Sequence, residues 1–170
     1  MSRAREGGAP GLPGPVRAVL CVCLGNICRS PIAEGVLRHR AREAGLALEV
    51  DSAGTGAWHA GEPPDRRATA AARRQGVILE GRARQVAVDD FARFDLVLAM
   101  DRSNHRDLLA RCPRPHVGKV RRLGEWDPRG GAPDVPDPYY GGDEGFDEVF
   151  ALVDRCARAL IAALQATDRP

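Results

Sequence analysis

The chain lacks several features that would mark a membrane, secreted or nucleic-acid-binding protein. Its formal net charge is only +2 over 170 residues, so charge gives no general reason to bind nucleic acid or a membrane. Residues 16–24 are apolar but too few to cross a bilayer, and they show no signal-peptide cleavage pattern. Five cysteines are an odd number and do not suit a disulfide framework. We therefore expect a protein of the reducing cytoplasm.

The composition, with 44% hydrophobic and 28% charged residues, is that of one ordinary globular domain. Residues 1–15 are rich in Gly, Pro and Arg, so we expect a disordered leader there and a single domain at 16–168. Apolar and helical patterns then alternate. They predict strands at 17–22, 47–51, 96–99 and 119–122, and helices at 31–44, 66–75, 88–94, 104–110 and 146–166. The alternation favours an α/β three-layer sandwich, with a four-stranded parallel sheet and helices on both faces, of the flavodoxin-like or Rossmann-like kind.

The most informative segment joins the first predicted strand to the first predicted helix, and it reads Cys23-Leu-Gly-Asn-Ile-Cys-Arg-Ser30. Ligands of parallel sheets bind at the carboxyl ends of strands, and helix N-termini attract anions. Gly25 and Asn26 tolerate a turn that aims successive N–H groups inward, while Arg29 can hold two oxygens of an oxyanion. These donors, the helix dipole and the guanidinium all favour the thiolate form of Cys23. The segment therefore predicts a phosphate-like anion beside an attacking sulfur.

Three plainer interpretations compete with this one. A single cysteine is most often a buried structural residue. A zinc site is disfavoured, because Cys21, Cys23 and Cys28 have no second Cys or His pair at familiar spacing and Arg29 would oppose a cation. A nucleotide-binding loop would need a Gly-Lys-Ser/Thr ending, which this segment lacks. The order of strand, cysteine, Gly-Asn, Arg-Ser, proline and helix favours the nucleophile, and we expect neither a metal nor a cofactor.

From Cys23 to Glu34 the sequence closely resembles the signature of the low-molecular-weight protein tyrosine phosphatases. Three further motifs fall in the order and approximate spacing of that family: Val50-Asp-Ser-Ala-Gly-Thr55, Ala99-Met-Asp101 with Ser103-Asn104, and Asp137-Pro-Tyr-Tyr-Gly141. The resemblance extends over residues 16–164. It implies the phosphotyrosine phosphatase I fold and metal-independent hydrolysis of phosphotyrosine in proteins through a phosphocysteine intermediate.

The resemblance also implies a role for each matching residue. Cys23 is the nucleophile, Arg29 clamps the phosphate, and Asp137 is the general acid that later activates water. The remaining substrate-binding positions of the loop are Leu24, Gly25, Asn26, Ile27, Cys28 and Ser30. Trp58, Tyr139 and Tyr140 match aromatic walls that suit the ring of phosphotyrosine, although packing in the core is an equal alternative for Trp58.

Four residues match positions that support the loop: Ser30, Ser52, Glu34 and Asp51. One departure from the family is Gln75, which stands where many members have a histidine before the glycine that ends the second helix. We expect Gln75 to donate one hydrogen bond to the network around Asn26 and the loop to be slightly less stable. Cys28 either traps an oxidised Cys23 as a reversible disulfide, as in the resembling family, or simply fills apolar space.

Other functions remain open within and beyond this fold. A thioredoxin-coupled arsenate reductase uses a similar loop but needs two further cysteines close together, whereas Cys112 and Cys156 are far apart in the sequence. Related phosphoarginine phosphatases tend to carry Thr where this chain has Ile27. A degenerate module that captures phosphopeptides without turnover is the non-enzymatic alternative. The expected partner is a phosphotyrosine-containing protein such as a tyrosine kinase, with no nucleic acid and no membrane, and the expected state is a monomer or weak dimer.

Overall fold

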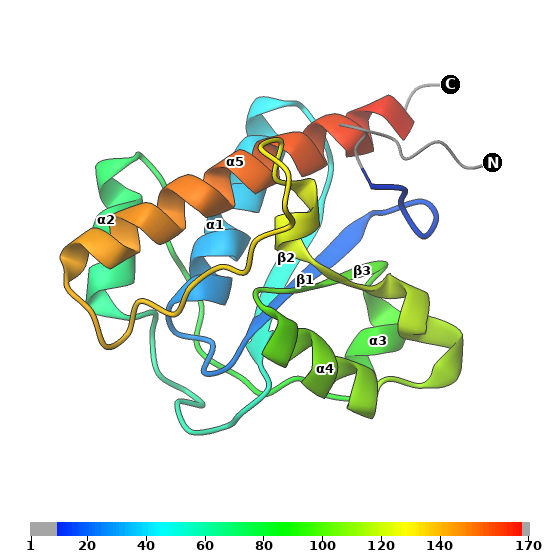
Figure 1. The fold of residues 1–170 in the computed structure, drawn as a ribbon, viewed down its shortest axis with the longest axis horizontal. Helices are drawn as coiled ribbons and strands as arrows, with labels where there is room; N and C mark the ends of the chain where they lie inside the picture. Colours follow the sequence, from blue (N-terminus) through cyan, green and yellow to red (C-terminus); the bar gives the residue numbers. More distant parts are fainter. Residues whose placement is uncertain (1–9, 168–170) are drawn as a thin grey trace.

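The computed structural model describes residues 10–167, and a four-stranded parallel sheet forms its centre (Figure 1). The strands are β1 (Ala18–Cys23), β2 (Glu49–Gly54), β3 (Leu96–Ala99) and β4 (Val120–Arg122), in the spatial order β2-β1-β3-β4. Each adjacent pair is parallel. All four predicted strands are confirmed, with β3 at its predicted bounds.

The predicted helices are also present, and two short 3₁₀ helices join them. The α-helices in the described part of the chain are α1 (Arg29–Glu43), α2 (Arg66–Arg74), α3 (Asp90–Arg93), α4 (Arg102–Arg111) and α5 (Asp143–Thr167); the 3₁₀ helices are η1 (Arg114–Lys119) and η2 (Leu123–Trp126). Helix α1 starts two residues earlier than predicted and includes Pro31 in its first turn. Proline is tolerated there because its missing N–H would have no partner within the helix.

Two hydrophobic clusters, one on each side of the sheet, hold the layers together. Alternate β1 residues Val19, Cys21 and Cys23 join the cluster built with α1, α2 and α5. Leu20 and Val22 point to the opposite cluster, built with α3 and α4, as the two-residue period of a strand requires. Figure 1 shows α1, α2 and α5 on one side of the sheet and α3 and α4 on the other. The α/β three-layer sandwich is therefore confirmed.

The topology places a ligand crevice at the end of β1. From β1 the chain passes to β2 on one side and later to β3 on the other, so the strand order reverses at this point. Crevices of this kind lie outside the carboxyl ends of the strands. Cys23 is the last residue of β1, which puts its side chain at the crevice.

The predicted leader lies partly outside the described residues. Residues 10–15 contain no helix or strand, yet Leu12 packs against the core and Arg121 Nη1 donates to the Gly11 carbonyl at 2.7 Å. Residues 1–9 and Asp168, at the predicted domain end, are outside the description. Within residues 10–167 no helix combines the length and apolar character needed to cross a bilayer.

Candidate active site

The loop from Cys23 to Arg29 curls around the sulfur of Cys23. Asn26 takes up a left-handed conformation, with φ of 58°, and its backbone N–H donates to Cys23 Sγ at 3.3 Å. Ser30 Oγ lies 3.0 Å from the same sulfur, in the first turn of α1. The sulfur therefore has two hydrogen-bond partners and lies at the N-terminus of a helix.

The side chain of Asn26 fixes the shape of this loop. It is 2% exposed, and its Nδ2 donates to Ser30 Oγ at 2.8 Å and to Ser52 Oγ at 2.9 Å. Its Oδ1 accepts the backbone N–H of Arg84 at 3.0 Å. Asn26 therefore ties the loop to β2 and to the segment that follows α2.

Behind Asn26, buried polar groups extend the network. Ser52 Oγ donates to Glu34 Oε1 at 2.6 Å, and Arg38 Nη2 donates to Glu34 Oε2 at 2.7 Å. Burial raises the pKa of Glu34, although its bonds to Ser52 and Arg38 oppose that shift. Asp51 touches this network through Arg84, whose Nη2 donates to its Oδ2 at 3.0 Å.

Gln75 does not take the supporting position expected of it. It is exposed at the C-cap of α2, and among residues 10–167 no hydrogen bond joins it to Asn26. Gly76 follows in a left-handed conformation, with φ of 80°, which ends the helix. The backbone of Arg84 reaches Asn26 instead, so the expected hydrogen bond from Gln75 is wrong.

Arg29 is buried and anchored on one side of the loop. Its Nη1 donates to Asp101 Oδ2 at 2.6 Å and to the Val135 carbonyl at 3.1 Å, and its Nη2 lies 3.8 Å from Asp137 Oδ2. Burial alone would lower the pKa of Arg29, but the negative charges of Cys23 and Asp101 outweigh it and raise that pKa. The guanidinium is therefore a fixed positive charge beside the sulfur.

Asp137 stands at the end of an extended segment, on the open side of the loop. Its carboxylate accepts the backbone N–H of Tyr139 at 3.1 Å, a local turn typical of Asp, and its side chain is 41% exposed. The carboxylate thus reaches both solvent and the guanidinium of Arg29.

One cavity of about 300 Å³ unites these groups. Its lining comprises Cys23, Leu24, Gly25, Ile27, Cys28, Arg29, Trp58, His59, Asp137, Tyr139 and Tyr140. Asn26, Ser30, Ser52, Glu34 and Asp51 lie outside that lining, and Asn26 and Ser30 touch the sulfur from behind.

The aromatic residues divide sharply between core and cavity. All four phenylalanines and Trp126 are buried. Trp58, Tyr139 and Tyr140 are 72%, 37% and 93% exposed, and all three line the cavity. Core packing is therefore not the role of Trp58. Its ring lies so close to Gly56 that any Cβ there would stand 1.8 Å from it.

Several residues of the site had no assigned role in the sequence. Asp101 anchors Arg29, and Arg38 and Arg84 support the network behind Asn26. His59 lines the cavity, with Nδ1 2.6 Å from Glu62 Oε2. Asp101 belongs to the family motif Ala99-Met-Asp101, so the sequence could have indicated its role. Arg38, Arg84 and His59 belong to no such motif.

The remaining cysteines divide between the cavity and the two faces of the sheet. Cys28 lines the cavity, and burial, followed by the charge of Asp65, raises the pKa of its thiol to about 12. Cys156 belongs to the cluster under α5, whereas Cys112 packs on the opposite cluster. An arsenate-reducing relay, which needs two further cysteines close together, has no support in this arrangement.

An α/β sheet with a cysteine-containing loop at its switch point, a buried arginine and a nearby carboxylate defines a class of phosphate-handling enzymes. A family model described as low molecular weight phosphotyrosine protein phosphatase matches residues 18–169. The low molecular weight protein-tyrosine-phosphatase of Streptomyces coelicolor is 47% identical over 152 residues, which cover 86% of this chain and 93% of that protein.

Solved structures agree with this match. A protein tyrosine phosphatase from Entamoeba histolytica, with Hepes in its active site, has a TM-score of 0.86 and 35% identity over 90% of this chain and 99% of its own. Vibrio vulnificus Wzb in complex with benzylphosphonate has a TM-score of 0.80 and 31% identity over 88% of this chain and 99% of its own. The chain belongs to the low molecular weight phosphotyrosine protein phosphatase family and is an enzyme, a hydrolase of the protein-tyrosine-phosphatase type.

Proposed function

We propose that the protein hydrolyses phosphotyrosine in other proteins without a metal ion, through a phosphocysteine intermediate on Cys23. The observation that carries this proposal is a single cavity that contains Cys23, Arg29 and Asp137 beneath three exposed aromatic side chains. Nucleophile, cation and acid are thus within reach of one bound phosphate ester.

In the first step Sγ of Cys23 attacks phosphorus and the phenolic oxygen leaves. Arg29 and the backbone N–H groups of residues 24–29 hold the equatorial oxygens as charge develops on them. Asp137 donates its proton to the leaving oxygen. Its position 3.8 Å from Arg29 supports this role, because a phosphate held by Arg29 would have its leaving group close to Asp137.

In the second step water attacks the phosphocysteine. Asp137, now ionised, accepts a proton from that water, and the sulfur leaves as a thiolate. Ser30 Oγ and Asn26 N–H are already within hydrogen-bond distance of Sγ. They stabilise the thiolate in the leaving step as in the attacking step.

The aromatic lining favours an aryl phosphate as substrate. Rings of Trp58, Tyr139 and Tyr140 offer apolar surface to a phenyl ring, and a relative of this chain binds benzylphosphonate, a phosphonate that carries a phenyl ring. Phosphoserine is too short to reach Sγ and cover these rings. The proposed partner is therefore a phosphotyrosine-containing protein, in the cytoplasm, where the five free cysteines would stay reduced.

Turnover of para-nitrophenyl phosphate with and without EDTA tests this mechanism. We expect activity to survive EDTA, to vanish in Cys23→Ser and to persist in Cys112→Ser, a control at a half-buried cysteine outside the cavity. Acid quenching during turnover should leave a phosphate on the peptide that contains Cys23. Activity that survives Cys23→Ser, or that disappears with EDTA, would contradict the proposal.

We also propose that Cys28 protects an oxidised Cys23. Peroxide would convert the Cys23 thiolate to a sulfenic acid, which condenses with the Cys28 thiol to a disulfide and releases water. Both residues line the same cavity. Dithiothreitol should restore peroxide-treated wild-type enzyme but not Cys28→Ser. Equal recovery of both proteins would show that Cys28 only fills space.

A further inference from the structure

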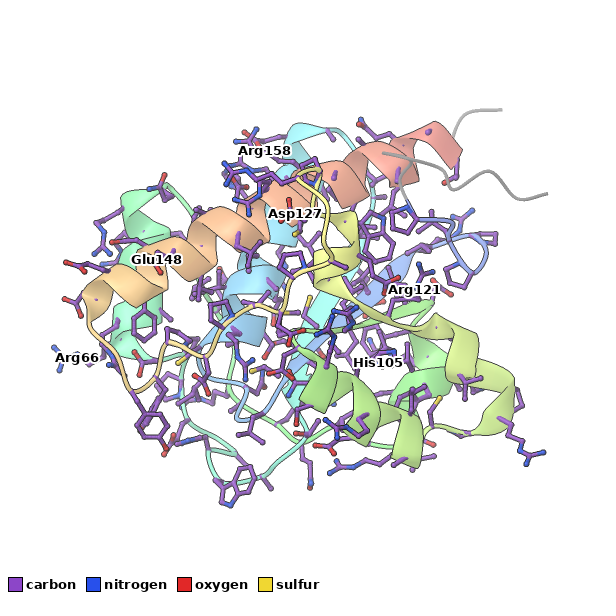
Figure 2. The ribbon with its side chains drawn as sticks, viewed as in Figure 1. Arg66, His105, Arg121, Asp127, Glu148 and Arg158 are labelled. Atoms are coloured by element: carbon purple, nitrogen blue, oxygen red, sulfur yellow. The ribbon has the colours of Figure 1, made fainter. Side chains whose placement is uncertain are left out.

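Helix α2 carries an arginine face beside the catalytic cavity, made of Arg66, Arg67, Arg73 and Arg74. Positions 66, 70, 73 and 74 share one side of a helix. Ala70, exposed between these arginines, leaves two hollows of about 470 and 620 Å³ that both border Arg66, Ala70 and Arg74. In Figure 2, Arg66 points away from the ribbon at the outer side of the molecule.

Two of the four arginines have structural partners. Arg67 pairs with Asp65 at 3.2 Å, and its guanidinium lies 4.6 Å from the ring centre of Phe146 and 5.5 Å from that of Tyr139. Arg74 pairs with Asp147 at 2.6 Å. These contacts fix α2 against α5 and against the aromatic wall of the cavity.

The other two arginines lack such partners within the described part of the chain. Neither Arg66 nor Arg73 has a carboxylate oxygen within 4.0 Å among residues 10–167, and both are exposed. Among residues 10–167 the borders of these hollows hold one acid without an ion pair, Asp143, which lines the first hollow together with Arg66 and Arg67. The face thus presents two guanidinium groups ready for external carboxylates.

The arginine face starts at the rim of the cavity. Asp65, the N-cap of α2, donates its backbone N–H to the carbonyl of Ile27 at 2.8 Å, and Ile27 lines the cavity. Arg66 follows directly. Arg73 lies seven residues further, about 10 Å along the helix, which is the length of about three residues of extended peptide.

We propose that this face binds acidic side chains that flank the phosphotyrosine of the protein substrate, one at Arg66 and a second about three residues further out at Arg73. The inference rests on the proposed function, because it assumes a phosphotyrosine seated over Cys23. The face would select phosphoproteins by the sequence around the tyrosine, which the aromatic walls alone do not read.

The test compares kcat/KM for three phosphotyrosine peptides at low ionic strength. Two carry a pair of glutamates three residues apart, on the N-terminal or the C-terminal side, and the third carries glutamine instead. The kcat/KM of one acidic peptide should be about tenfold higher than that of the neutral peptide, which corresponds to about threefold for each exposed ion pair. The difference should come mainly from a lower KM. The preference should shrink as salt is added.

The deciding variant is Arg66→Gln/Arg73→Gln, which should lose the preference while its turnover of para-nitrophenyl phosphate stays unchanged. The matched control, Arg42→Gln/Arg114→Gln, removes the same charge. Arg42 lies in the last turn of α1, and η1, which contains Arg114, precedes β4, so both are at the edge of the sheet opposite the cavity. The control should keep the preference.

Three results would overturn the proposal: equal kcat/KM for acidic and neutral peptides, a preference that survives in Arg66→Gln/Arg73→Gln, or a preference lost equally in the control. Binding of the same peptides to Cys23→Ser, measured by fluorescence anisotropy, separates this proposal from the proposed function. If wild-type protein did not turn over para-nitrophenyl phosphate, the function would fail. Tighter binding of the acidic peptide than of the neutral peptide to Cys23→Ser would still support the role of the arginine face, and equal binding would refute it.

Discussion

Asn26 offers the sharpest test of how the phosphate loop is held. Its side chain makes three hydrogen bonds, to Ser30, Ser52 and the backbone of Arg84, and its φ of 58° lies where most residues are strained. Two substitutions separate these contributions. Asn26→Gly loses the hydrogen bonds but adopts the left-handed backbone conformation without strain. Asn26→Ala loses the same hydrogen bonds and is also strained in that conformation.

The expected magnitudes follow from these contacts. Three buried hydrogen bonds at about 0.5–1.5 kcal/mol each give a loss of about 1.5–4.5 kcal/mol in the free energy of unfolding for Asn26→Gly. The left-handed backbone should make Asn26→Ala worse by about 1 kcal/mol. Because the N–H of residue 26 also faces Sγ of Cys23, a loop displaced by about 1 Å should lower kcat/KM about 100-fold.

Urea unfolding gives the stability of both variants, and para-nitrophenyl phosphate kinetics give their activity. Ser52→Ala serves as a comparison, because it removes one of the three partners of Asn26 together with the hydrogen bond from Ser52 to Glu34. It should therefore lower the stability but leave the other two bonds of Asn26 in place. An Asn26→Ala variant as stable as Asn26→Gly would refute the role of the backbone. Full activity in either variant would refute the claim that Asn26 shapes the loop.

Three further changes test other parts of the site. Asp137→Ala should slow esters of poorly acidic phenols more than esters of good leaving groups, and equal losses would argue against an acid role. Asp101→Asn should lower kcat/KM about 10- to 100-fold, because a charged hydrogen bond to Arg29 is worth about 1.5–3 kcal/mol; unchanged kinetics would show that Arg29 needs no anchor. For Glu34 the folded-state pKa is raised above 4.5, so its protonation stabilises the fold below that pH, and the stabilisation is lost as pH rises through the raised pKa. Urea unfolding should be measured for wild type and for Glu34→Gln as pH rises from below 4.5 through the raised pKa. The free energy of unfolding should show this loss in wild type but not in Glu34→Gln.

The sequence was most informative where the chemistry is local. Cys23, Asn26 and Arg29 lie within one turn between a strand and a helix, so their proximity follows from the order of residues alone. The strand and helix pattern also predicted the sheet. Asp137 lies far along the chain, and the spacing of family motifs, rather than a local rule, suggested its place.

Contacts made only by the folded chain could not be predicted in this way. Arg84 reaches Asn26 through a backbone N–H, which carries no side-chain signal. The hydrogen bond expected from Gln75 followed from a family position instead, and it was wrong. Asp101 is close to Arg29 because β3 lies next to β1, and its carboxylate also accepts the backbone N–H of Asn104 at the start of α4. One residue thus starts a helix and anchors the guanidinium, and the sequence pattern of a helix cap does not reveal the second role.

The placement of aromatic residues bears most directly on the choice of substrate. A chain with only 5% aromatic residues leaves Trp58 and Tyr140 largely in solvent, although burial of such side chains is favourable. Both line the cavity above Cys23. A substrate ring that covers about 100 Å² of this apolar surface would contribute about 2.5 kcal/mol to binding. A phosphate ester without a ring gains little of this energy, so the exposed aromatic side chains favour aryl esters before any chemistry begins.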